Sequence, residues 1–310
     1  MKRRKSKSRV KVSFAATILV LVTITVIAYS LSFRIPSYSV PAALPSYGGL
    51  IARYAPTDAL QVSYDNLTAV RALNESAIPN TQLVNLVRPA VTIRYDTVGA
   101  QVLVTILNPA LNINDTATAA VLNSEAYSNL SKALTTSTLV PDQEMGYSLY
   151  KVNDSSNGRT KTEWLTLVPS GSSIIFAEEN VAGAVDARAV ILRMLSVFDG
   201  TSPSILSIQN VTRMLYPVSG TDHLAISIQN FTGEVQTSSM GVVTADVSNQ
   251  EVQLTHVVRF TSSGQASSQV GEVKAVYKFA TDFSQWEESI KAVQTLSFTN
   301  LQEAVELTGV

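Results

Sequence analysis

Histidine, the commonest acid–base catalyst, occurs only twice in this chain. The two histidines, His223 and His256, fall in separate strand-like segments, whereas a metal site needs several His, Cys or carboxylate ligands close together. Asp222 precedes His223 directly, so in a strand the two side chains point to opposite faces and cannot form an orienting pair. The sequence therefore predicts no metal site, and we place both histidines in the core or on the surface.

Ser148 and Lys151 spell S-x-x-K, a nucleophile-and-base spacing that works on a helix, where positions three apart share a face. The surrounding segment GYSLYKV has a strand pattern, which sends the two side chains to opposite faces. No G-x-S-x-G and no phosphate-binding glycine loop occur in the sequence. We therefore expect no catalytic serine and no cofactor.

Paired acids, Glu178 with Glu179 and Asp142 with Glu144, would suit glycoside hydrolysis if their carboxyl groups lay about 5–10 Å apart. Acids at loop and helix starts more often contact solvent or favour the helix dipole. The sequence therefore assigns no catalytic residue.

Asn-x-Ser/Thr triplets are the most frequent motif, and each is an acceptor for Asn-linked sugar if it faces the outside of the cell. An Asn before a helix also caps it, which suits Asn66 and Asn210. Asn153 lies in the turn-rich stretch around DSSNGRT, so we expect it among the most accessible acceptors. The candidate glycosylation sites are Asn66, Asn74, Asn114, Asn129, Asn153, Asn210 and Asn230.

Both tryptophans have apolar neighbours at the proper period. Trp164 falls in a strand pattern, and Trp286 falls in a C-terminal pattern that predicts an amphipathic helix. We expect both to pack in the core rather than to form a sugar-stacking platform.

The elements that carry these residues follow an N-terminal membrane anchor. Residues 1–11 form a basic head with seven Lys or Arg, and Val12 to Phe33 then runs 22 residues without a charge. That length crosses a bilayer core of about 30 Å as a helix, and the basic head stays in the cytoplasm. We predict a retained signal anchor at 12–33. The alternative is a signal peptide cleaved near VPAALP.

Residues 34–49, rich in Pro, Ser and Gly, predict an extended stalk. Of 23 basic residues, eight lie within 1–34, which leaves 15 against 24 acids and a net charge of −9 for the outer part. This charge excludes nucleic acid as a partner. The chain has no cysteine, so its outer domain has no disulfides.

Strand and helix patterns alternate after the stalk. Residues 59–64 predict a strand that leads into a helical stretch at 67–73, and 91–96 with 102–107 predict a hairpin around Thr97–Ala100. A helix is predicted from Asp115 through DTATAAVLNSEAYSNLSKAL. A hairpin of GYSLYKV and TEWLTLV follows, and the strand SIIFA then leads into the helix NVAGAVDARAVILRML.

The later part predicts the strand 224–228 and a hairpin of VVTADV and VQLTHVVRF with its turn at 248–251. EVKAVYKF is predicted as a strand, and SQWEESIKAVQTL and NLQEAVEL as helices.

TDALQVSYDNLT, from Thr57 to Thr68, is repeated 164 positions later as TDHLAISIQNFT, from Thr221 to Thr232, with six residues kept in step. The similar element order after each copy predicts two duplicated halves, 50–140 and 141–310. The predicted fold class is α+β, with a mixed or antiparallel sheet and packed helices.

A basic head, an anchor, a Pro/Ser/Tyr stalk and a cysteine-free outer domain rich in sequons together resemble signal-anchored, N-glycosylated cell-surface proteins of archaea. The stretch SSIIFAEENVAGAVDARAVILRML followed by TDHLAISIQ also looks like anchored bacterial and archaeal proteins in which a strand leads into such a helix. The resemblance implies a membrane-anchored domain on the outer side of the membrane and leaves its activity open.

We therefore expect a single-pass membrane protein with its C-terminal domain outside the cytoplasm, acting as a non-enzymatic envelope binding or scaffold module. Its expected partners are the membrane, through 12–33, and an envelope protein or polysaccharide. The alternative is an anchored hydrolase or solute-capturing domain that uses a cleft between the two halves.

Overall fold

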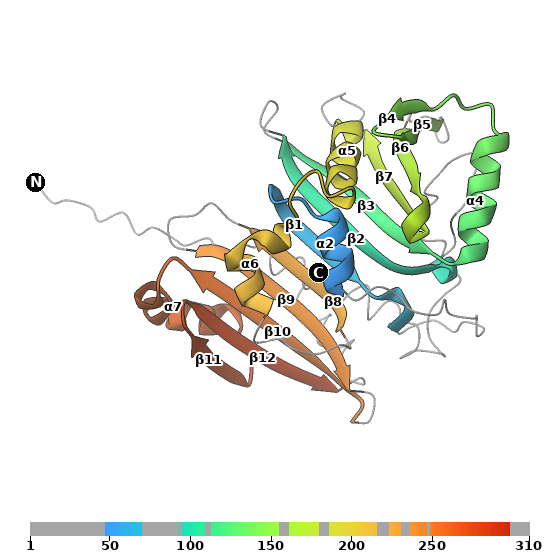
Figure 1. Cartoon of the computed structure of the whole chain (residues 1–310). Helices are drawn as coiled ribbons and strands as arrows, with labels where there is room; N and C mark the ends of the chain where they lie inside the picture. The colour runs from blue at the N-terminus through green and yellow to red at the C-terminus, as the bar shows by residue number, and fades with distance from the viewer. Residues whose placement is uncertain are drawn as a thin grey trace, which may run out of the picture.

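The computed structural model of the chain describes residues 47–69, 93, 95–108, 113–154, 161–179, 186–215, 223–230, 236–246 and 249–297. These residues form an α+β fold built on one twelve-stranded sheet (Figure 1). The strand order is β11-β12-β10-β9-β8-β1-β2-β3-β7-β6-β5-β4, and the strand pairings between these elements are antiparallel. The predicted α+β class is confirmed.

The strands are β1 Ala59–Asp65, β2 Val98–Asn108, β3 Ile113–Leu122, β4 Asp142–Glu144, β5 Tyr147–Asp154, β6 Lys161–Val168, β7 Ser173–Glu179, β8 His223–Asn230, β9 Gln236–Asp246, β10 Glu251–Phe260, β11 Asp282–Trp286 and β12 Ser289–Ser297. The α-helices are α2 Tyr47–Tyr54, α4 Ser124–Thr136, α5 Ala187–Phe198, α6 Gln209–Leu215 and α7 Ser263–Val276.

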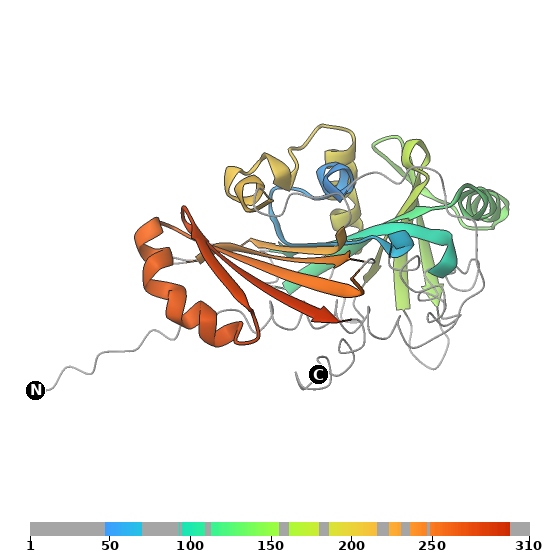
Figure 2. The same ribbon diagram turned by 90° about the horizontal axis from the view of Figure 1, so that it is seen from below.

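One face of the sheet is covered by α2, α5 and α6, which Figure 2 shows together on one side. Val62 and Tyr64 of β1 and Ile226 and Ile228 of β8 are buried in this core. Burying an aliphatic side chain of this size stabilises the fold by about 1.5–3 kcal/mol.

The repeated segments predicted one buried face of Leu60, Val62 and Tyr64 in β1 and of Leu224, Ile226 and Ile228 in β8. The prediction holds for the four residues above, whereas Leu60 is only half-buried, because the register of β1 shifts between Ala59 and Gln61. The side chain of Leu224 lies outside the described part of the structure.

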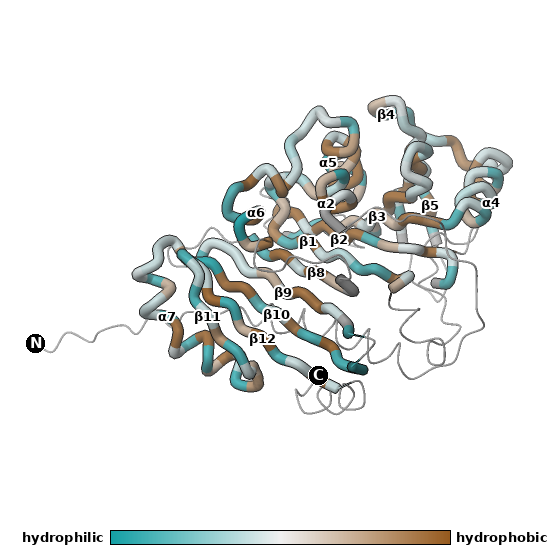
Figure 3. The backbone as a smooth tube through the Cα atoms, turned by 60° about the horizontal axis from the view of Figure 1, so that its bottom comes forward, coloured by the Kyte–Doolittle hydropathy of each residue, from teal (hydrophilic) through white to brown (hydrophobic). Residues whose placement is uncertain are grey.

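The opposite face is covered by α4 towards one end of the sheet and by α7 towards the other. Leu130 and Leu134 of α4 belong to one buried cluster, and Ala266 and Val273 of α7 belong to another. Each helix begins at a side-chain cap, Asn123 for α4 and Ser262 for α7. Figure 3 shows hydrophobic and hydrophilic stretches alternating along β10 and β12, as expected for strands with distinct faces.

The strands of the two repeated segments lie side by side, because β1, from segment 57–68, pairs with β8, from segment 221–232, in the middle of the sheet. Val62 lies opposite Ile228, and Tyr64 lies opposite Ile226. Ser63 lies opposite Ser227, which is also the residue that the repeat aligns with it. Exchanging the two copies therefore leaves the pairing unchanged.

The next two strands on each side have matching lengths. Shifting β2, Val98–Asn108, by 138 positions gives 236–246, the bounds of β9. The same shift takes β3, Ile113–Leu122, to 251–260, the bounds of β10. The sheet thus extends outward through β2 and β3 from β1, and through β9 and β10 from β8.

The helix predicted from Asp115 is wrong in its first part. Residues 113–122 form β3, and α4 begins only at Ser124. The alanines of DTATAAVL favour a helix, but Ala117 and Ala119 alternate with Thr116 and Thr118 and point into the core beneath α5. Small side chains on one face of a strand allow a helix to pack closely, so tertiary packing decides here against local propensity.

Two C-terminal predictions are also wrong, because helix and strand are exchanged. EVKAVYKF, predicted as a strand, lies largely in α7, which starts at Ser263 and ends at Val276. SQWEESIKAVQTL, predicted as a helix, forms β11 and β12 around a turn in which Glu287 has a φ of 49°. Pairing of β12 along most of β10 satisfies its backbone groups, which overrides the local helical pattern. The predicted helix NLQEAVEL lies outside the described residues.

Two further boundaries differ from prediction. The turn predicted at Thr97–Ala100 is occupied by the end of a 3₁₀ turn and the start of β2, so β2 pairs with β1 and β3 rather than with 91–96. Gly48 and Gly49, predicted to end the stalk, lie in α2. The hairpins β5–β6 and β9–β10, the strand β7 and the later part of the helix after it are confirmed.

The basic head at 1–11, the anchor at 12–33 and the stalk as far as residue 46 lie outside the described residues. Within the part of the chain that the structure describes, no helix has both the length and the apolarity needed to cross a membrane.

Candidate functional site

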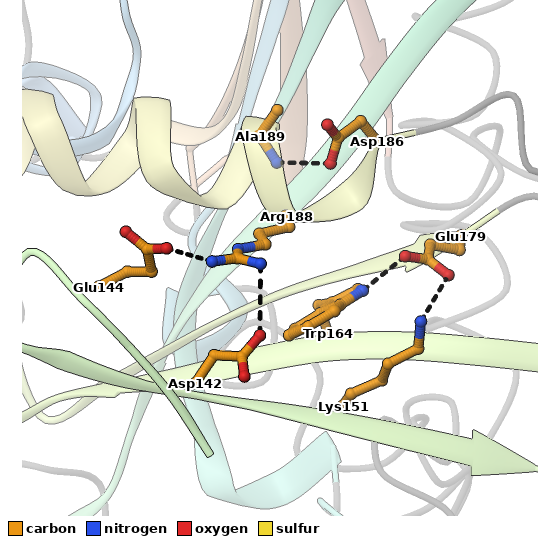
Figure 4. Close-up of polar contacts among 8 residues, drawn as sticks. All are labelled: Asp142, Glu144, Lys151, Trp164, Glu179, Asp186, Arg188 and Ala189. Atoms are coloured by element: carbon orange, nitrogen blue, oxygen red, sulfur yellow. Dashed lines mark hydrogen bonds and ion pairs between the residues drawn. The ribbon is translucent and has the colours of Figure 1, made fainter.

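A group of charged side chains surrounds Trp164 on β6 (Figure 4). We call this group the Trp164 cluster, and its members are Trp164, Lys151, Glu179, Arg188, Asp142 and Glu144. The Trp164 Nε1–H donates to Glu179 Oε1 at 2.6 Å, and Lys151 Nζ lies 3.4 Å from Glu179 Oε2. Both cations also lie against the indole, with Lys151 Nζ 5.2 Å and Arg188 Cζ 5.6 Å from its ring centroid.

Arg188 joins α5 to the edge of the sheet. Its guanidinium lies 3.3 Å from Asp142 Oδ2 and donates to Glu144 Oε1, so both acids of the edge strand β4 hold one cation. The helix is aligned for this contact by Asp186, whose carboxylate accepts from the Ala189 N–H as the N-cap. Because Trp164 is only 7 % exposed, the cluster seals the end of the core rather than opening a site on the ring.

The structure places the predicted acid pairs in this cluster. Asp142 and Glu144 share one face of β4 and pair with Arg188, as expected for residues two apart in a strand. Glu178 and Glu179 are adjacent in β7, so they point to opposite faces, and Glu179 is held by Trp164 and Lys151. The carboxylates of Asp142, Glu144 and Glu179 are thus engaged by cations, an arrangement that fits a structural role.

Ser148 and Lys151 lie in β5, which is the strand that the sequence predicted. Ser148 Oγ accepts from Gln143 Nε2, whereas Lys151 reaches Glu179 on the other face. The S-x-x-K spacing therefore brings no nucleophile and base together.

His256 is buried on β10 beneath the end of α7. Its ring stacks on Tyr277 with the centroids 4.4 Å apart, and burial lowers the pKa of His256 to about 4. His223 begins β8. Among the residues that the structure describes, no three His, Cys, Asp or Glu side chains gather as a metal site would require.

The sequons are spread over several elements. Asn114, Asn129, Asn153 and Asn210 have exposed side chains on β3, α4, β5 and α6, whereas Asn230 is half-buried at the end of β8. Asn66 is half-buried, and its Oδ1 accepts from the Ala69 N–H, which is the capping contact that its position suggested. Asn74 lies outside the described residues.

Trp286 is in β11, not in a helix, and is 37 % exposed, so the prediction of core packing is wrong for it and right for Trp164. The sequence placed Trp286 on the apolar face of a helix, but at the edge of the sheet β11 has a neighbour on one side only. This leaves its ring at the rim of the sheet.

Sequence reasoning missed Arg259. This residue lies between Val258 and Phe260 at the end of β10 and is 1 % exposed, although it carries a full charge. Its Nη2 group donates to Glu288, whereas its Nε and Nη1 atoms are buried without a hydrogen-bond partner. A single Arg at the end of an otherwise apolar strand was the available signal, because arginine is rarely buried unless paired.

The middle of the face opposite α2 carries a row of polar residues. Thr116, Thr105, Gln61, Gln229 and Ser239 lie opposite one another across five neighbouring strands. The two threonine hydroxyls are 3.1 Å apart and share a hydrogen bond, but the Gln229 Oε1 atom is buried without a partner. A buried acceptor left unpaired costs about 1–3 kcal/mol. This row therefore detracts from stability and is a second polar feature that the predictions did not contain.

No protein-family model matches the sequence, and no curated protein matches it. Among solved structures, the fold is similar to crystal forms I and III of a protein designated TP0453, with a TM-score of 0.43 for both. The identities are 10 % and 9 %, and each match covers 87 % of this chain and 100 % of the other.

Proposed function

We propose that this chain is a membrane-tethered extracytoplasmic glycoprotein that acts as a non-enzymatic binding or scaffold module of the cell envelope. Residues 12–33 cross the membrane once, the basic head at 1–11 stays in the cytoplasm, and the described domain lies outside. Its partner is an envelope protein or an envelope polysaccharide. The amino-terminal charge pattern supports this orientation.

The observation that carries the scaffold role is the continuous sheet. β1 and β8 pair over five residues at its centre, so the strands before and after this pair belong to one hydrogen-bonded unit. The competing hydrolase or solute-capturing function depended on a cleft between two halves. Because these halves meet as paired strands, the binding module is favoured.

The exposed acceptors Asn114, Asn129, Asn153 and Asn210 support the glycoprotein assignment, since a sugar can be attached there without disturbing a cap. At Asn66 a glycan would compete with the hydrogen bond from Ala69. We therefore expect the four exposed sites to be occupied more often than Asn66.

The proposal also includes an internal duplication. The symmetric register around Ser63 and Ser227, and the common shift of 138 positions for β2 and β3, support two related halves. Because β4 to β7 lie beyond β3 in the sheet, they group with the first half. The boundary that best fits the pairing therefore falls after α5, near residue 200, rather than between 140 and 141.

Matched substitutions test the duplication. Val62→Asp and Ile226→Asp each bury an unpaired charge at equivalent positions, and both should lower the free energy of unfolding by several kcal/mol, roughly 4, in chemical denaturation. Gln61→Ser is the control and should change it by less than about 1 kcal/mol. Ala225 on β8 is unsuitable as a matching control, because it is 3 % exposed and packs in the core on the other face. A large effect at Val62 with none at Ile226 would contradict the equivalence.

Native material tests the function itself. Protease added to intact cells should remove the domain and leave a protected N-terminal fragment, and peptide mass spectrometry should find sugar at exposed sequons. Affinity purification from the native membrane should then recover the same envelope protein or polysaccharide repeatedly. A domain that survives in intact cells and is digested only after lysis would rule out the topology, and turnover of a glycoside or peptide substrate by the pure domain would overturn the non-enzymatic role.

A further inference from the structure

Three neighbouring strands place a cation and two hydroxyl groups in one row beneath α6. Arg259 on β10 lies opposite Ser238 on β9 and opposite Ser289 on β12. Directly opposed residues in a sheet project to the same face, so the three side chains form one row with Arg259 in the middle and a serine about 5 Å away on each side. All three residues are at most 1 % exposed.

Most of the hydrogen-bonding groups in this row have no partner. The Nε and Nη1 atoms of Arg259 and the Oγ atoms of Ser238 and Ser289 are buried and unpaired, whereas Arg259 Nη2 donates to Glu288. A buried guanidinium that keeps several unsatisfied N–H groups is unfavourable, and two unpaired hydroxyls beside it add to the penalty. The group that satisfies such a set is a negatively charged one with several acceptor oxygens, which can accept from the guanidinium and from both hydroxyls.

We propose that Arg259, Ser238 and Ser289 form a binding site for one oxyanion group, a carboxylate or a phosphate, which α6 and the turn at Glu287 and Glu288 cover in this structure.

The cover is held by contacts that can separate. α6 packs on β9 and β10, and its Arg213 reaches the turn through an ion pair of 3.8 Å with Glu287. Both side chains of this pair are more than a third exposed, so solvent screens their attraction. Glu288 in the same turn supplies one carboxylate to Arg259 and therefore competes with an incoming anion. This site goes beyond the proposed function and does not depend on it.

Thermal unfolding of the purified full chain, titrated with sodium phosphate or with sodium acetate against sodium chloride at equal ionic strength, tests the proposal. The unfolding temperature should rise with phosphate or with acetate and stay constant with chloride, because an anion that binds only the folded chain stabilises it. The ion with the larger shift identifies the oxyanion type. No shift with either ion in the native chain and in Glu288→Gln would overturn the proposal.

Glu288→Gln separates binding from a structural role of Arg259. Removing the Glu288 carboxylate frees the hydrogen bond that Arg259 donates to it. The ligand can then accept this bond, so phosphate or acetate binding should strengthen by roughly tenfold. Arg259→Met should abolish the shift. Arg193→Met, which removes an equal charge from an exposed ion pair with Asp58, should leave it unchanged. If Glu288→Gln binds the anion no better than the native chain, the site is not the one proposed.

Discussion

Arg188 and Arg259 lie toward opposite ends of the same sheet, and their surroundings differ in almost every respect. Arg188 is partly exposed and is engaged by two carboxylates and an indole ring. Arg259 is buried and has one carboxylate, with two of its nitrogen atoms unpaired. A partly exposed arginine held by two carboxylates fastens one element to another, whereas a buried arginine with unmet hydrogen bonds is retained at a cost to stability. Arg188 is therefore a structural contact, and Arg259 is a candidate for ligand binding.

The largest expected loss of stability comes from removing the carboxylate that pairs with Arg259, and the matched control removes one that pairs with Arg188. Glu288→Ala leaves the Arg259 charge buried and unpaired, so the free energy of unfolding should fall by about 3–5 kcal/mol. Glu144→Ala leaves Arg188 with Asp142 and with solvent, so the loss should stay below about 1 kcal/mol. Urea unfolding of the two variants measures both values. Equal losses would mean that the two arginines do not differ as described.

Lowering the pH should destabilise the fold through His256, which lies on the same strand as Arg259. Its pKa is about 4 in the folded chain against an ordinary 6.5, so the unfolded chain binds a proton more readily. The free energy of unfolding should therefore fall as the pH drops from about 6.5 to about 4, by about 3 kcal/mol in total, with no further loss from this group below that range. Stability measured against pH in the native chain and in His256→Phe tests this. The variant should lack this component, and an unchanged profile would exclude His256 as its source.

Helix caps allow a comparison of two regions of the sheet at equal chemistry. Asn123 caps α4 and Ser262 caps α7, each through a side-chain oxygen that accepts from a backbone N–H. Replacing either one by Ala should lower the free energy of unfolding by about 1 kcal/mol. Chemical denaturation of the two single variants would show similar losses. A loss at only one of them would show that the helices contribute unequally to the fold.

The smallest effect is expected for Arg188 itself. Arg188→Met keeps an apolar stem against Trp164 and removes two partly exposed ion pairs, so the change should be below about 1 kcal/mol. The emission wavelength of the Trp164 indole should shift, because the variant removes a cation near its ring. A destabilisation near that of Glu288→Ala would assign the Trp164 cluster a larger share of the stability than its exposure implies.

Local patterns predicted the elements that have strong short-range signals. The hairpins β5–β6 and β9–β10 carried clear alternation and turn residues, and the buried positions of Val62 and Ile226 followed from their period. The prediction of a helix over β3 failed because its alanines suit either a helix or a strand. Only the packing of α5 on Ala117 and Ala119 decides between the two. In β12, pairing with β10 decided the structure, and no local window contains that information.

The chemistry was predictable only where it depended on spacing. The separation of Ser148 from Lys151 followed from strand geometry alone. The gathering of Asp142 and Glu144 on Arg188 required the position of α5 over the sheet edge. The row of Ser238, Arg259 and Ser289 depends on strand register, which joins residues far apart in the chain.

The pairing of β1 with β8 also sets the order in which the chain can be completed during synthesis. β1 ends at Asp65 and β8 ends at Asn230, so 165 further residues must be made before the second strand is finished. At a translation rate of about 5–20 residues per second, one edge of β1 stays open for roughly 10–30 s. An open strand edge is a template for pairing with other chains. The nascent protein is therefore open to association with another copy of itself in that interval, and the long sequence separation between β1 and β8 slows the formation of this strand pair.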